Sequence, residues 1–108
     1  MHRYFCGFIA ILCLLPTIGL AIPESTAPVS VTEIRPYVNG TIFVTVDSVE
    51  LCNTYTFRID FAATGKNSMY AAVLTALATG KKVRLEVHTG TGCQGWGTAL
   101  QSVYLQAN

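Results

Sequence analysis

Charge is scarce in this sequence, and neither sign is in clear excess. Its 108 residues include 7 Lys and Arg and 6 Asp and Glu, so the formal net charge is only +1. The nearest approach to a basic cluster is the pair Lys81 and Lys82 with Arg84. Proteins that bind nucleic acid neutralise phosphates with a basic surface. The composition therefore argues against nucleic acid as a partner.

Histidine is also scarce, and His88 is the only one outside the N-terminal segment. A single imidazole cannot build the clustered sites that hold zinc or non-haem iron. Four residues could be combined with it on paper into a hydrolytic triad: Ser68, Ser102, Asp60 and Glu86. No Gly-x-Ser-x-Gly nucleophile elbow accompanies them. We therefore predict a protein with no catalytic residues, no metal site and no cofactor.

Long apolar runs are confined to the N-terminus. His2 and Arg3 precede an apolar run over residues 4–15, and a segment of small residues ends at Ala21. This is the three-part layout of a secretory signal peptide, and the run is shorter than the roughly 18 residues that a membrane-spanning helix needs. We predict that residues 1–21 are cleaved, leaving a formally neutral protein with no membrane span. The mature protein is expected to be secreted or periplasmic.

Few cysteines remain once this segment is removed. Cys6 and Cys13 leave with the signal peptide, and the mature chain keeps Cys52 and Cys93. In an oxidising compartment such a pair has one intramolecular partner choice, and a metal or redox role would need more ligands or a Cys-x-x-Cys spacing. We predict a disulfide between Cys52 and Cys93. It would close a loop of about 40 residues and stabilise the fold by roughly 4 kcal/mol.

Strand patterns fill the first half of the mature chain, over residues 29–38, 41–46 and 55–61. Pro36 kinks the first strand, and Asn39-Gly40 predicts a tight hairpin turn between the first two. The third strand alternates polar residues with apolar ones, which is typical of a half-buried strand; the apolar ones are Tyr55, Phe57, Ile59 and Phe61.

A helix pattern separates these strands from two more, over residues 82–88 and 98–105. Asn67 or Ser68 can cap its start, and Gly80 lies where a C-terminal cap is expected. Its predicted buried face consists of Met69, Ala72, Val73, Ala76 and Leu77. The order β-β-β-α-β-β gives a mainly β fold with one helix, which is the connectivity of an OB-like barrel. We predict a flexible lead-in over residues 22–28 and a single OB-like domain over residues 29–108.

A glycine-rich stretch over residues 89–97 joins the last two strands. Its segment 90–95, Gly-Thr-Gly-Cys-Gln-Gly, matches the letters of a dinucleotide-binding motif. That motif requires a helix directly after it, and here a strand follows. Trp96 lies between two glycines, either as a plug over the barrel end or as an exposed platform on which a sugar ring can stack. We favour the plug and keep Trp96 as the candidate ligand-contact residue.

Four segments of the chain carry a family resemblance: Asn67–Leu74, Ala78–Val83, the motif Gly92-Cys93-x-Gly95-Trp96, and Ser102–Leu105. They resemble small exported bacterial proteins related to the B subunit of subtilase cytotoxin and to pertussis-like toxin B subunits. The resemblance implies an OB-like barrel that assembles as a ring of five and binds sialylated host glycans, while a separate chain does the chemistry. We therefore expect a non-enzymatic binding protein with a glycan partner. The alternative is a stand-alone secreted or periplasmic structural or protein-interaction domain.

Overall fold

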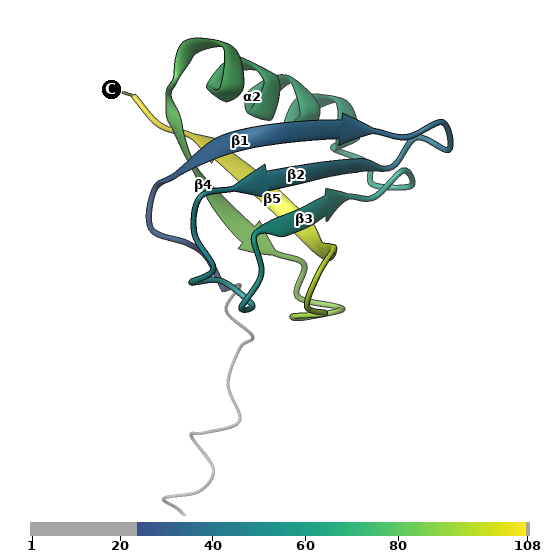
Figure 1. Cartoon of the computed structure of the whole chain (residues 1–108). Coiled ribbons are helices and arrows are strands. Elements are labelled where there is room, and N and C mark those ends of the chain that lie inside the picture. Colours follow the sequence, from purple (N-terminus) through teal and green to yellow (C-terminus); the bar gives the residue numbers. More distant parts are fainter. Residues whose placement is uncertain (1–23, 108) are drawn as a thin grey trace, which may run out of the picture.

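The computed structural model describes residues 24–107. Five strands form a closed barrel, and one helix packs against it (Figure 1). Its elements are β1 (Val29–Pro36), β2 (Ile42–Val46), β3 (Thr56–Ile59), α2 (Lys66–Thr79), β4 (Lys82–Val87) and β5 (Thr98–Leu105). Around the barrel the strand order is β1-β2-β3-β5-β4, with β3 and β5 parallel and the other pairs antiparallel. The predicted fold class and element order are confirmed, and they are consistent with a small OB-like barrel. The predicted signal peptide, residues 1–21, lies outside the described residues.

Alternate residues of the strands fill the barrel. In β2 the side chains of Ile42, Val44 and Val46 are buried, while Phe43 and Thr45 lie on the outer face. This follows from the two-residue period of an extended strand. The largest fully buried side chains are Phe57, Ile59, Leu85, Val44, Val46, Val73, Val83 and Thr98. Every second side chain of β2 therefore faces away from the core.

The third strand is shorter than predicted. Phe57 and Ile59 are fully buried, as the alternating pattern requires. Tyr55 and Phe61, which continue the same pattern, are 53% and 59% exposed. Alternation assigns a face only while the backbone stays extended. Tyr55 precedes the first residue of β3, and Phe61 lies beyond its last. Both aromatic side chains therefore belong to the surface of the adjoining loops.

The helix α2 lies over one end of the barrel (Figure 1). It begins after Gly65, whose carbonyl accepts the first helical hydrogen bond at 3.0 Å. Neither Asn67 nor Ser68 caps it as predicted, because the turn before Gly65 has already started the helix. Its end matches the prediction: Gly80 has φ 75° and closes the helix. Among the described residues, no helix has the length and hydropathy that crossing a membrane requires.

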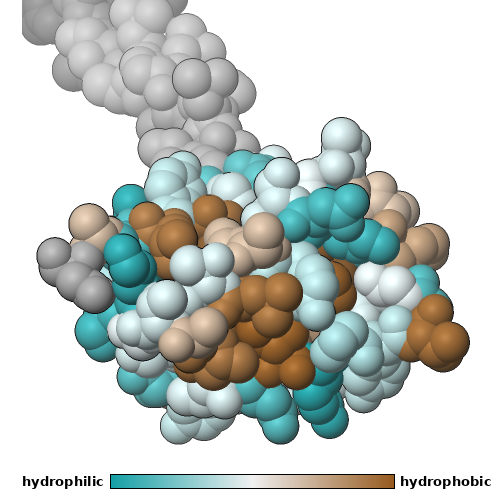
Figure 2. All heavy atoms as spheres, turned by 90° about the horizontal axis from the view of Figure 1, so that it is seen from above, coloured by the Kyte–Doolittle hydropathy of each residue, from teal (hydrophilic) through white to brown (hydrophobic). Residues whose placement is uncertain are grey.

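One face of α2 packs on the core through Met69, Val73 and Ala76. Leu77, predicted for the same face, is 42% exposed, and Leu74 is 41% exposed. The buried residues have the spacing i, i+4, i+7, and a narrow stripe of this kind leaves Leu77 at its rim. After its first residue the helix has no charged side chain. Figure 2 views the molecule from the side of α2 and shows apolar side chains gathered on this face.

Residues 24–26 pair with β4, which differs from the predicted flexible lead-in. Ser25 forms a bridge with Glu86. The Thr26 N–H donates to the Leu85 carbonyl at 3.0 Å, and Thr26 Oγ1 accepts from the Leu85 N–H at 3.1 Å. Thr26 is 5% exposed. Local composition suggested flexibility, but the hydrogen-bond partners of this segment lie far along the chain, and the folded unit extends at least to residue 24.

Candidate functional site

A disulfide joins the two loops at the end of the barrel away from α2. Cys52 lies in the loop between β2 and β3, and Cys93 lies in the loop between β4 and β5. Their Cα atoms are 5.2 Å apart, and 41 positions separate them in the sequence. The predicted disulfide is confirmed. Such a bond is compatible with an oxidising, exported compartment.

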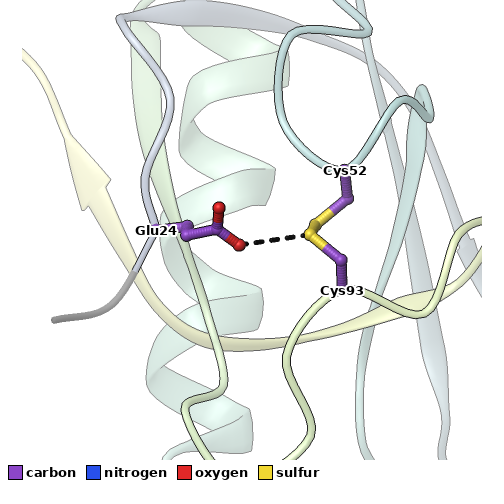
Figure 3. A group of neighbouring side chains, drawn as sticks. All are labelled: Glu24, Cys52 and Cys93. Atoms are coloured by element: carbon purple, nitrogen blue, oxygen red, sulfur yellow. Dashed lines mark hydrogen bonds between the residues drawn. A yellow bond between two sulfur atoms is a disulfide. The ribbon is translucent and has the colours of Figure 1, made fainter. Parts of the chain in front are cut away.

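Glu24 approaches this disulfide from the N-terminal segment (Figure 3). Its Oε2 atom lies 3.3 Å from Cys93 Sγ. A disulfide sulfur carries no proton, so the pair is a close contact and does not form a hydrogen bond. Glu24 and the two sulfurs lie within 4.8 Å of one another, which is close enough for shared metal ligation. Metal ligation requires thiolates, however, and the disulfide leaves the carboxylate as the only donor of this group.

An open hollow lies on the outer face of β1, β2 and β3, beside the joined loops. Its volume is about 750 Å³. Tyr55 and Trp96 line it from the two loops, and Glu33 and Arg35 line it from β1. Thr45 from β2 adds a hydroxyl group. The hollow thus combines aromatic surface with several hydrogen-bonding groups.

Trp96 lies exposed at the surface, so the favoured prediction of a plug over the barrel end is wrong. Its side chain is 60% exposed. The indole stacks on Phe43 with ring centroids 4.9 Å apart, and Phe43 meets Tyr37 edge-on at 5.1 Å. Phe43 points outward from β2, because its neighbours Ile42 and Val44 point into the core. Trp96 therefore lies outside the barrel wall, where a ligand can reach its free face.

The backbone on both sides of Trp96 is held by hydrogen bonds. Gly95 and Gly97 have φ values of 69° and 81°, a conformation that favours glycine. Arg58 Nη1 donates to the Gly97 carbonyl at 2.7 Å, and Thr98 Oγ1 donates to the Gly95 carbonyl at 2.6 Å. Thr98 is itself fully buried. The backbone on either side of the indole is thus held in place by side chains of β3 and β5.

Tyr55 and Trp96 share a spacing that the sequence analysis missed. Each follows a bridged cysteine by three residues, Tyr55 after Cys52 and Trp96 after Cys93. The disulfide therefore joins the two loops that carry the aromatic walls of the hollow. Tyr55 was assigned to the inner face of a strand, so its role was not predicted. The repeated Cys-x-x-aromatic spacing is the feature that could have revealed it.

The structure does not pair His88 with Ser102, two residues of the hypothetical hydrolytic set. Asp60 and His88 line a second hollow of about 230 Å³. His88 Nδ1 accepts a hydrogen bond from the Gly90 N–H at 3.0 Å, and Ser102 Oγ donates to a Glu86 carboxylate oxygen. A serine nucleophile would instead need to contact the imidazole. Ser102 and His88 do not form that pair.

Comparison with known proteins does not identify a family. No protein-family model matches the chain, and no curated protein matches it significantly. The resemblance to toxin B subunits stays a prediction.

Proposed function

We propose that this protein is an exported, non-enzymatic binding protein that holds a glycan in the hollow beside Trp96. The observation that carries the proposal is the exposed indole on a hydrogen-bonded loop. Sugar rings have apolar faces that pack on aromatic side chains, and their hydroxyl groups need polar partners. Trp96 and Tyr55 supply the aromatic surface. Thr45 and Asn53 are among the residues that supply polar partners for the hydroxyl groups.

The position of the hollow in the barrel supports the same proposal. OB-like barrels bind oligosaccharides and oligonucleotides on the face of their second and third strands. Here Thr45 on β2 and Thr56 on β3 both line the hollow, with their Oγ1 atoms 3.3 Å apart. The low positive charge of the chain disfavours the oligonucleotide.

Secretion or a periplasmic location is part of the proposal. It is supported by the disulfide and by the layout of residues 1–21, which is typical of a signal peptide. A secreted binding protein would meet extracellular or cell-surface glycans directly.

Fluorescence titration tests glycan binding, because Trp96 is the only tryptophan in the chain. The mature protein is titrated with a panel of neutral and acidic oligosaccharides, with free N-acetyltryptophanamide as the control for optical artefacts. A sugar ring on the indole removes water from it, so we expect a saturable blue shift with at least one glycan. Calorimetry checks binding independently of the indole. No response in either measurement across the panel would contradict the proposal.

The outer face of α2 favours a second candidate function, contact with another protein. Leu74 and Leu77 are about two-fifths exposed, and the face is uncharged. Exposed apolar patches of this kind mark interaction sites. We propose a second copy of this chain as the partner, because two uncharged faces meet without like-charge repulsion. A contact between the same face of two copies closes as a dimer, so it differs from the ring of five that the resemblance implies, which needs two different faces.

Light scattering across a dilution series tests this second candidate. We expect a mass above that of the monomer, and we expect Leu77→Lys to lower it by placing a charge in the contact. Leu105→Lys is the matched control, since Leu105 is 40% exposed on β5. A monomer at every concentration would exclude self-association and leave the glycan proposal intact.

A further inference from the structure

The hollow beside Trp96 carries two charged side chains of opposite sign. Glu33 and Arg35 lie two residues apart on β1, so both point to its outer face. Arg35 Nε lies 3.8 Å from Glu33 Oε1. The other described residues that line the hollow are uncharged. The hollow therefore has no net charge.

This arrangement gives little attraction for an anionic sugar. A carboxylate placed near Arg35 would be attracted by the guanidinium and repelled by Glu33 at a similar distance, so the two contributions largely cancel. The side chains of Arg35 and Glu33 are 45% and 58% exposed, and water and salt screen what is left. Binding an acidic sugar would require a cation that no neighbouring carboxylate offsets.

The same pair suits a neutral sugar. A hydroxyl group can donate a hydrogen bond to the Glu33 carboxylate and accept one from the Arg35 guanidinium. Hydrogen bonds to charged groups are stronger than those between neutral groups, so the pair can replace the water that a sugar hydroxyl loses. Arg35 also lies over the Tyr37 ring at 5.8 Å, which limits the positions of its guanidinium.

We infer that the hollow takes an uncharged oligosaccharide, with one ring stacked on Trp96 and hydroxyl groups of the chain bonded to Glu33 and Arg35. The inference rests on the proposed glycan function and departs from the sialylated ligands that the resemblance implies. The hollow is open to solvent, so a chain of several sugar rings can extend beyond the ring on Trp96.

The test uses matched sugars on the whole mature protein. Each probe is a pair of neutral di- or trisaccharide and its uronate, in which the terminal CH₂OH group is oxidised to a carboxylate. We expect the neutral member to bind wild type at least as tightly as the uronate, with little dependence on salt. In Glu33→Gln the charge of Arg35 is no longer offset, and uronate affinity should rise about two- to five-fold at low salt and fall back at high salt.

Glu50→Gln is the control, because it changes the net charge equally at an exposed residue that does not line the hollow. It should leave the ratio of uronate to neutral affinity unchanged. Tighter, salt-sensitive binding of the uronate by wild type would overturn the inference while leaving glycan binding in place. An equal response of Glu33→Gln and Glu50→Gln would also overturn it. Binding of no sugar by any variant would remove the glycan function and this inference together.

Discussion

Removal of the disulfide in a Cys52→Ala, Cys93→Ala double variant is expected to lower the free energy of unfolding by about 4 kcal/mol. The two cysteines are 41 positions apart, so the bond restricts a large part of the unfolded chain. Cys93 is exposed and Cys52 only partly buried, so little apolar packing is lost with them. For a domain of this size the melting temperature should fall by about 15–30 °C. Urea denaturation and calorimetry measure both quantities.

Reduction provides the control for this variant. Wild type in excess dithiol should match the stability of the double variant, because both lack the bond and keep the same core. The single variant Cys52→Ala should expose the Cys93 thiol to a thiol reagent, whereas unreduced wild type should not react. A double variant as stable as oxidised wild type would show that the bond does not restrict the unfolded chain.

Local patterns predicted the fold well because they act within each element. The pleat of a strand turns alternate side chains to the same face. The structure accordingly buries Ile42, Val44 and Val46 of β2 and Phe57 and Ile59 of β3. Gly80 ends α2 as predicted, since a left-handed cap is a property of the residue itself. The cysteine pair was predictable because the predicted removal of residues 1–21 would leave only one pairing.

Contacts between residues far apart in the sequence account for the wrong predictions of side-chain position. Trp96 stacks on Phe43, more than fifty positions earlier in the chain, and no local pattern indicates on which side of the barrel wall that contact forms. Thr26 is held by Leu85 in the same way. Tyr55 extends the alternating pattern to a position before the start of β3, and it was therefore placed inside. The hollow is built from such residues, so its location could not be derived from the sequence.

Replacement of Trp96 by alanine is expected to weaken glycan binding about 30-fold or more, because central tryptophans in binding sites contribute about 2 kcal/mol or more when truncated. The folded state should survive. Trp96 is 60% exposed, and its main internal contact is the stacked pair with Phe43, which is worth about 0.5–1.5 kcal/mol. Calorimetry measures the affinity, since the variant has no tryptophan. Trp96→Phe keeps an aromatic face and should retain part of the binding.

Phe61→Ala is the matched control for this prediction. Phe61 is 59% exposed, almost the same as Trp96, and it does not line the hollow. Both variants remove a large exposed aromatic side chain, so a general effect of surface hydrophobicity on sugar binding would appear in both. Loss confined to Trp96→Ala assigns binding to the hollow. Equal affinities of the two variants would mean that the glycan binds elsewhere, because the hollow without its indole keeps only the aromatic wall of Tyr55.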